Sequence, residues 1–159
     1  MPERLIDVPI ESLPFVDEHA VEVEASAERT WEALLATVRG LGRGHGRLAA
    51  RALGCLSVDS SGAAGRIGST VPGFIVTRSI RPALLALMGE HRFSRYALVF
   101  SVTPLGDGDR VRVAAETRAE FPGRSGRVYR GLVIGSRGHV VATHTILRAV
   151  KRRAEASGA

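Results

Sequence analysis

The sequence predicts an α+β fold in which a curved antiparallel β-sheet wraps around a long C-terminal helix. Two observations carry this prediction. Between residues 18 and 121, apolar and polar residues alternate in several segments, which is the period of half-buried strands. After Pro122 and Gly123 the apolar period changes to 3.6 residues, which is the period of an amphipathic helix. A run of strands followed by a helix indicates the α+β class.

The opening of the chain predicts a strand that runs into helices. Residues 18–25 alternate cleanly and place His19 on the inner face of a strand. Ser26 stands at a helix N-cap position. The apolar residues that follow recur at helical spacing, namely Ala27, Trp31, Leu34, Leu35 and Val38. Four glycines between residues 40 and 46 end this helix, and a second short helix is expected over residues 47–53.

Strands dominate the middle of the chain, and one long helix is expected after them. The strand segments are residues 74–80, 83–88, 92–102 and 110–121, with a hairpin turn over PLGDGD at 104–109. Segment 83–88 fits a strand and a helix equally by period, and its neighbours favour a strand. Residues 125–155 read as one helix, in which three glycines (Gly131, Gly135 and Gly138) indicate a close packing contact or a bend.

Length and composition fit one domain with its own core. The chain has 159 residues, 45% of them hydrophobic, so a single domain is expected over 17–156 after an extended lead-in over 1–16. Cys55 is the only cysteine, which excludes an intrachain disulfide and a multi-cysteine zinc site. No apolar run reaches the length of a membrane span, and the acidic N-terminus does not resemble a signal peptide, so a cytoplasmic protein is expected.

The net charge of +6 does not by itself predict a nucleic-acid partner. All but one of the 22 Lys and Arg residues are arginine, which fits a GC-rich genome, and they are spread along the chain with one modest C-terminal cluster. Nucleic-acid binding would need a concentrated basic face that carries stacking aromatic residues. We therefore expect no nucleic-acid partner, and assign the C-terminal cations to the negative end of the helix dipole.

The sequence resembles the START-like, or SRPBCC, superfamily over roughly residues 15–155. The opening HAVEVEASAERTWEALL looks like the strand, cap and Trp-bearing helix with which that superfamily begins. The central GSTVPGF, the strand HRFSRYALVF and the ending from ETRAEF onward look like its actinobacterial polyketide-cyclase-like and uncharacterised branches. The resemblance implies a helix-grip fold with a cavity for a lipid, a polyketide or another hydrophobic molecule. It implies no catalytic residue, because the superfamily has no shared catalytic motif.

Metal and cofactor chemistry find no support in the motifs. His139 and His144 are five residues apart, so on a helix they point about 140° from one another, whereas a metal pair needs spacing i, i+4. The glycine-rich stretch GLGRGHG follows a helix rather than a strand and lacks the dinucleotide-binding spacing. We therefore expect neither a metal nor a cofactor.

The C-terminal helix carries a buried stripe that is polar in its middle. Residues that share one face at 100° per residue are Val128, Leu132, Gly135, Ser136, His139, Thr143, Ile146, Leu147 and Val150. Burying Ser136, His139 and Thr143 costs free energy unless each finds a partner. They either bond to the sheet, the helix backbone or water, or line a cavity and meet a ligand. We expect His139 to face the cavity as a neutral imidazole, since no acid shares the stripe.

Strand 92–102 offers further candidates for the site. Tyr96 shares the apolar face of this strand and is either a core aromatic residue or a hydroxyl donor to a ligand. Arg92 is either a solvated strand end or a guanidinium at the cavity mouth, and Tyr129 either closes the cavity or packs on a loop. The candidate ligand-binding residues are therefore Arg92, Tyr96, Tyr129, Ser136, His139 and Thr143, and the catalytic residues remain unknown.

Two functions fit these residues. The first is the binding of a small lipid-like or polyketide-like molecule between sheet and helix. The second is a cyclase or dehydratase on the same scaffold, with His139 as general acid/base, oriented by Tyr96 or Ser136. In addition, Ile134 and Val141 lie opposite the buried stripe, so we expect either the lead-in or the neighbouring subunit of a homodimer to cover them.

Overall fold

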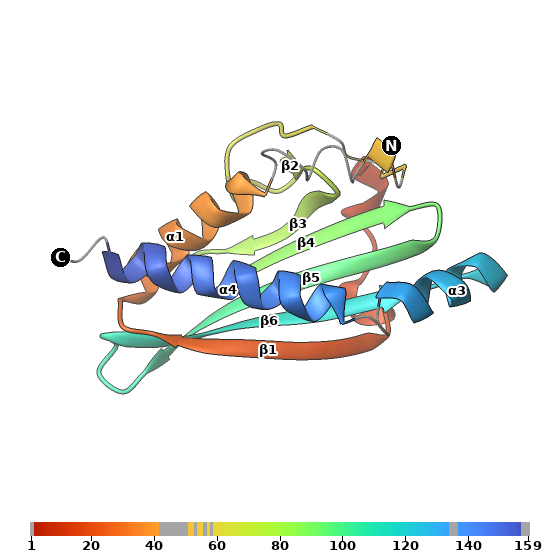
Figure 1. Ribbon diagram of the computed structural model, residues 1–159. Coiled ribbons are helices and arrows are strands. Elements are labelled where there is room, and N and C mark those ends of the chain that lie inside the picture. Colours follow the sequence, from red (N-terminus) through yellow and green to blue (C-terminus); the bar gives the residue numbers. More distant parts are fainter. Residues whose placement is uncertain are drawn as a thin grey trace.

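Six antiparallel strands form one curved sheet in the computed structural model, which describes residues 2–41, 51–52, 54–55, 57, 59–133 and 137–156 (Figure 1). Their spatial order is β1-β6-β5-β4-β3-β2. The strands are β1 (Phe15–Val23), β2 (Thr70–Val71), β3 (Phe74–Ile80), β4 (Leu84–His91), β5 (Ser94–Leu105) and β6 (Arg110–Glu120). The α+β prediction is therefore confirmed, and segment 83–88 is a strand.

The first strand begins three residues earlier than the alternation suggested. β1 starts at Phe15, and a register shift against β6 lies between Phe15 and Asp17. This irregularity hides the period-two pattern in the sequence, because the residues before it do not continue the alternation. As a result, Asp17 stands in the strand, two residues before His19 and on the same side of the sheet.

The helix after β1 forms where the sequence placed it. α1 spans Ala27–Gly40, and the Ser26 side chain accepts a hydrogen bond from the Arg29 backbone N–H at 3.4 Å, which confirms the N-cap. Trp31, Leu34 and Val38 are buried, so the apolar stripe of α1 faces the sheet. The second expected helix, 47–53, lies outside the described residues except for positions 51 and 52.

Two helices, not one, occupy the C-terminal segment. α3 spans Gly123–Val133 and α4 spans Gly138–Ala156, and Arg137 just before α4 has a left-handed backbone with φ of 55°. α3 continues past the end of the sheet (Figure 1). Val128 was expected on the buried stripe but is 68% exposed, because α3 does not lie against the sheet. None of the helices in the described ranges is long and apolar enough to span a membrane.

The main core lies between the inner face of the sheet and helices α1 and α4. α4 packs against α1, β1 and β6. Three of its residues, Leu147, Val150 and Ala154, have no exposed surface. They meet Phe100 and Val113 among the inward residues of β5 and β6. The helical period thus predicted the C-terminal half of the buried stripe correctly.

A second core lies on the outer face of the sheet, under the N-terminal lead-in. The lead-in was expected to be extended, but it forms two 3-10 turns, η1 (Pro2–Leu5) and η2 (Ile10–Ser12). Its buried residues are Leu5, Ile10 and Leu13, and they pack on outward residues of β3, β4 and β5, namely Ile75, Ala86, Met88 and Ala97. Turns of three or four residues leave little periodic signal in a sequence with several prolines.

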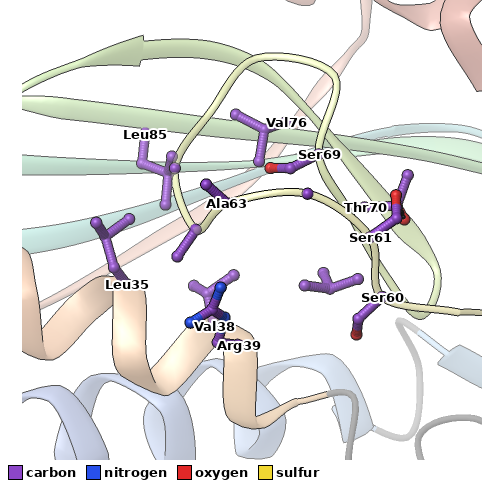
Figure 2. Close-up of a pocket in the computed structure, with 14 residues that line it drawn as sticks. Leu35, Val38, Arg39, Ser60, Ser61, Ala63, Ser69, Thr70, Val76 and Leu85 are labelled. Carbon is purple, nitrogen blue, oxygen red and sulfur yellow. Dashed lines mark hydrogen bonds between the residues drawn. The ribbon is translucent and has the colours of Figure 1, made fainter.

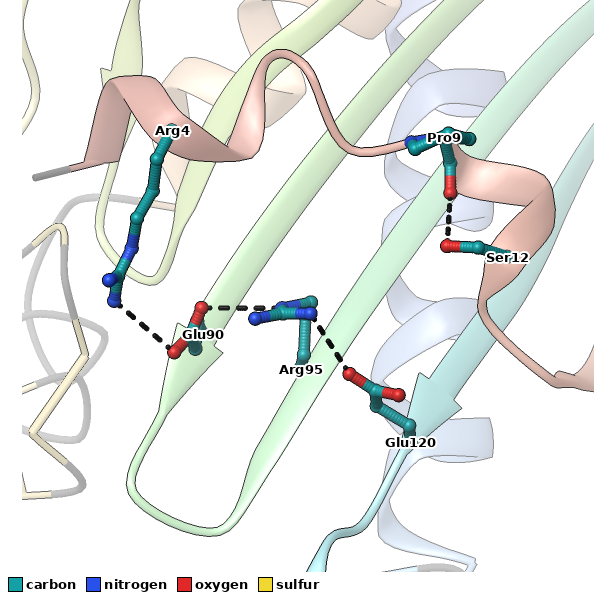
Figure 3. A network of polar contacts seen from close by, with 6 residues as sticks. All are labelled: Arg4, Pro9, Ser12, Glu90, Arg95 and Glu120. Carbon is teal, nitrogen blue, oxygen red and sulfur yellow. Dashed lines mark hydrogen bonds and ion pairs between the residues drawn. The ribbon is translucent and has the colours of Figure 1, made fainter.

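Ion pairs tie the lead-in to the sheet and the strands to one another. Figure 3 shows Arg4 against Glu90, with Arg95 between Glu90 and Glu120. The Arg4–Glu90 pair is 3.4 Å long and its Arg4 side chain is 60% exposed, so it contributes little to stability. The apolar contacts therefore dominate the attachment of the lead-in.

The lead-in can be tested by shortening one of its buried side chains. We expect Leu5→Ala to lower the free energy of unfolding by about 2–5 kcal/mol, because it leaves a cavity in the outer core. Ile80→Ala is the control, since Ile80 is 55% exposed and should change stability by about 0.5 kcal/mol or less. Urea unfolding measures both, and equal small effects would show that the lead-in does not stabilise the domain.

Candidate functional site

A cluster of one acid and three histidines joins the start of β1 to the start of α4. The Nε2–H of His139 donates to Asp17 Oδ2 at 2.8 Å, and His19 Nε2 lies 3.1 Å from the same oxygen. The ring of His144 packs on that of His19 with centroids 4.6 Å apart. The side chains of Asp17, His19 and His139 are 22%, 23% and 15% exposed, so the cluster is sheltered but within reach of solvent.

The Asp17 carboxylate is the centre of this cluster. Burial alone would raise the pKa of Asp17, but the hydrogen bonds from His19 and His139 outweigh it and hold the pKa below its ordinary value. Asp17 is therefore ionised at neutral pH and accepts from both imidazoles. An acid that fixes the ring of a histidine is the arrangement used in many acid–base pairs.

His139 faces the sheet as the helical period predicts, and although no acid shares its stripe on the helix, an acid from another element, Asp17, lies beside it. The acid comes from β1, 122 residues earlier in the chain, and no analysis of the helix alone could find it. Thr143 is 5% exposed, and its hydroxyl donates to the carbonyl of His139 at 2.8 Å. The helix backbone therefore satisfies Thr143, which was one of the two alternatives. Ser136 and the side chain of Tyr129 lie outside the described part of the chain.

Tyr96 lies on the inner face of β5, where its ring covers a glycine of the next strand. Gly89 pairs with Tyr96 across β4 and β5, and a Cβ atom on Gly89 would lie 2.5 Å from that ring. The hydroxyl donates to the carbonyl of Gly73 at 2.7 Å. Phe74 packs edge-on against the ring with centroids 5.2 Å apart. The hydroxyl is thus tied to the backbone while the ring stays half-buried.

Two titratable groups that the sequence did not single out adjoin Tyr96. Cys55 Sγ lies 3.7 Å from the Tyr96 hydroxyl, and burial raises the pKa of the Cys55 thiol. The His91 ring lies 5.4 Å from the Tyr96 ring, and burial lowers the pKa of His91. Both groups are therefore held in their uncharged forms at neutral pH, which suits the wall of an apolar site.

The structure does not bring Tyr96 to His139. Tyr96 pairs with Ala119 of β6 and Gly89 of β4, whereas Asp17 pairs with Thr117 of β6. The two groups are therefore separated by the width of two strands, about 10 Å. Asp17, rather than Tyr96, lies beside His139, and Ser136, the other expected partner, is outside the described residues.

Arg92 is exposed in the turn between β4 and β5, and its guanidinium lies 5.5 Å from the centre of the Phe93 ring. It borders a groove of about 320 Å³. The groove is lined by Gly54, Glu90, His91, Arg92, Ser94, Arg95, Glu120 and Pro122. This volume lies at the lower end of the range of small-molecule sites, about 300–1,000 Å³. His91 links the groove to Tyr96 because it contacts both.

A separate pocket lies between the end of α1 and the loop before β2 (Figure 2). Leu35, Val38 and Arg39 face Ser61 and Thr70 across it. Its volume is about 30 Å³, enough for one or two water molecules. It is therefore too small for an organic ligand.

The histidine cluster does not have the geometry of a metal site. Within the described ranges, no group of three or more His, Cys, Asp or Glu side chains could hold a metal ion. The chemistry that these residues offer is hydrogen bonding and proton transfer.

Several solved structures share this fold at low sequence identity. A point mutant of norcoclaurine synthase from Thalictrum flavum, in complex with a transition-state analogue, aligns with a TM-score of 0.55 at 17% identity, over 93% of this chain and 100% of that one. The same enzyme in complex with dopamine and hydroxybenzaldehyde gives 0.50 at 19% identity, over 87% and 86%. The protein TTHA0849 from Thermus thermophilus gives 0.52 at 18% identity, over 92% and 100%.

The chain therefore has a helix-grip α+β fold, which is the fold that the sequence resemblance implied. No family model matches the sequence, and no curated protein matches it. The similarity to known proteins is thus a similarity of fold, and the functional argument depends on the site.

The Asp17 contacts can be tested through their pH dependence. We expect Asp17→Asn to lower the free energy of unfolding by about 1–3 kcal/mol at neutral pH, because charge-assisted hydrogen bonds are lost. Since the folded pKa is depressed, this stabilisation is complete above the unfolded value of about 3.9 and is lost as pH falls through the folded pKa. Denaturant titrations of both proteins from about pH 6 to about pH 2 check it. A difference that stays constant over this range would contradict it.

The Tyr96 hydroxyl can be tested by removing one atom. Tyr96→Phe leaves the Gly73 carbonyl without this donor, so we expect a loss of about 1 kcal/mol in thermal or urea unfolding. The control is Thr103→Val, because it removes a hydroxyl from an exposed position of the same strand. Equal effects in the two variants would argue against a specific role for the Gly73 contact.

Proposed function

We propose that this protein binds a small hydrophobic molecule between the inner face of the sheet and α4, with its polar end toward the Asp17–His139 pair. The observation that carries the proposal is the change from polar to apolar buried side chains along α4. Its C-terminal half is sealed by Leu147 and Val150, whereas its first turns hold a sheltered polar cluster that solvent can reach. Ligand sites have this composition, mostly apolar with a few placed polar groups.

The fold supports the proposal by analogy. Norcoclaurine synthase has been solved with dopamine and hydroxybenzaldehyde, which are small aromatic molecules, and its structure shares the fold of this chain. Fold alone does not transfer a function, so the analogy indicates only that a protein with this fold can bind small aromatic molecules. In this chain, the proposed ligand lies between the Asp17–His139 pair and Tyr96, with entry from the groove beside Arg92.

The second candidate is an enzyme that moves a proton to or from its ligand. The 2.8 Å hydrogen bond between His139 and Asp17 favours it, since a carboxylate that orients an imidazole is a common device in acid–base catalysis. The reaction class that fits is a cyclisation or dehydration of a polyketide-like substrate. Turnover of a candidate ligand, absent in His139→Leu, would distinguish this activity from binding alone.

The binding proposal can be tested with ligand carried from expression. We expect native mass spectrometry of the purified protein to show a bound small molecule, and His139→Leu to weaken its affinity by about 1 kcal/mol or more, since the ligand loses a polar partner. Thr145→Leu is the control, because Thr145 lies on the exposed side of α4.

The readouts of this test separate binding from stability. If His139 served the fold alone, His139→Leu would change the unfolding free energy and leave ligand affinity equal to that of the wild type. That outcome would contradict the proposed role of His139.

A further inference from the structure

The charges of the chain are divided unevenly along the sequence. Residues 121–154 contain eight of the 22 Lys and Arg residues and none of the 16 Asp and Glu residues. The rest of the chain therefore holds 14 basic and 16 acidic residues and is close to neutral. The positive charge of the protein is concentrated in α3 and α4, although arginine is spread throughout the sequence.

Seven of these eight cations are exposed, and we name six of them the arginine surface: Arg124, Arg127, Arg130, Arg137, Arg148 and Arg152. The other two are engaged by the body of the domain. Lys151 bonds to Glu155 at 2.9 Å and to the carbonyl of Glu22 at 2.7 Å, and Arg153 lies 3.3 Å from the hydroxyl of Thr37.

The arginine surface is arranged along one side of each helix. Arg124, Arg127 and Arg130 recur every three residues, so they share one side of α3. On α4, helical spacing puts Arg148 and Arg152 in line with Val141, on the side away from the sheet.

Exposed apolar side chains lie among these arginines. Val128 and Val141 are 68% and 66% exposed, and they account for two of the five large hydrophobic residues that the described ranges leave exposed. The sequence analysis expected a cover over Val141, and no described part of the chain provides one. Ile134, its expected neighbour, lies outside the described residues.

The α3 residues whose burial is described show little of the packing that normally stabilises a helix. Gly126 is its one buried residue among those whose burial is described, and a Cβ atom there would lie only 2.6 Å from the carbonyl carbon of Phe121. Isolated helices of fewer than about 12–15 residues are marginal in water, and glycine lowers helix stability further. α3 has 11 residues, three of them glycine, and it extends past the sheet (Figure 1). A partner that covers α3 would therefore stabilise it.

We propose that the arginine surface docks this protein on the headgroups of an anionic lipid bilayer. Basic helices with exposed apolar residues bind such interfaces, where arginines meet lipid phosphates and apolar side chains enter the acyl boundary. Val128 and Val141 supply the apolar part. A second copy of the chain fits this surface poorly, because two acid-free arginine surfaces repel one another. The proposal does not depend on the ligand proposed above.

The test is co-sedimentation of the full chain with vesicles of phosphatidylcholine, with or without phosphatidylserine. We expect binding to the phosphatidylserine vesicles, weakening as salt rises, and little binding to the neutral ones. Substituting Arg124, Arg127 and Arg130 together by Gln should weaken binding on the order of a hundredfold, at about fivefold for each arginine. The double variant Val128→Ser/Val141→Ser should also bind the phosphatidylserine vesicles more weakly than the wild type, but with the same dependence on salt.

The matched control is the same triple change at Arg29, Arg51 and Arg66, which are exposed and lie outside the acid-free segment. It removes the same charge and should keep vesicle binding within a few-fold of the wild type. Circular dichroism melting of each variant confirms folding.

The proposal would be overturned if both triple variants lost the same vesicle affinity, if the protein bound neutral vesicles as tightly as anionic ones, or if it bound no vesicles. It would also be overturned if the protein bound duplex DNA more tightly than vesicles and the Arg124, Arg127 and Arg130 variant lost that DNA binding. Dimerisation through α3, seen by sedimentation equilibrium and lost in the Val128/Val141 variant, would assign the surface to a second copy instead.

Discussion

The packing of the C-terminal half of α4 on the inner face of the sheet is the contact on which the rest of the structure depends. Leu147, Val150 and Ala154 are completely buried there, and α1 packs beside them. This contact fixes the direction in which α4 crosses the strands, and so determines that its first turns pass over the start of β1. The meeting of His139 with Asp17 is a consequence of that crossing, since neither residue is close to the other in sequence.

The two ends of α4 therefore have different roles. Toward residue 154 it seals an apolar core, where any polar group would need a partner. Toward residue 138 it contributes imidazoles and a threonine to a sheltered polar cluster. Such a gradient gives a helix-grip scaffold one stable end and one chemically useful end, and the second is where ligand binding or proton transfer is proposed.

Local periodicity was enough to predict the fold but not the site. The alternation of β6 and the stripe on α1 both follow from the burial of one face, which a sequence shows directly. β4 is buried on both faces, so its own period fitted a strand and a helix equally, and only its neighbours indicated a strand. Asp17 was missed because the register shift beside it interrupts the alternation, although its position two residues before His19 was a readable signal. The other contacts of the candidate site depend on residues far apart in the sequence, since no period relates β1 to α4 or Tyr96 to Gly73.

The C-terminal segment illustrates the limit of helical periodicity. Its apolar spacing continues through the position where the chain turns, so a single helix was predicted, and the glycines alone indicated a bend. Arg137 then adopts a left-handed backbone, which separates α3 from the surface that α4 covers. The apolar helical spacing in the sequence thus includes residues that the fold does not bury, as the exposure of Val128 shows.

The outer core has a consequence for the order in which the chain can fold. Leu5, Ile10 and Leu13 are synthesised before the strand residues that bury them, which lie between residues 75 and 97. Until those strands have formed, the lead-in has nowhere to bury its apolar side chains, and the outward residues of β3 and β4 have nothing over them. Closing contacts over such long stretches of chain is slow, and uncovered sheet faces associate with one another in the meantime. The nascent protein is therefore most vulnerable to aggregation after its sheet has assembled and before its own N-terminus returns to cover it.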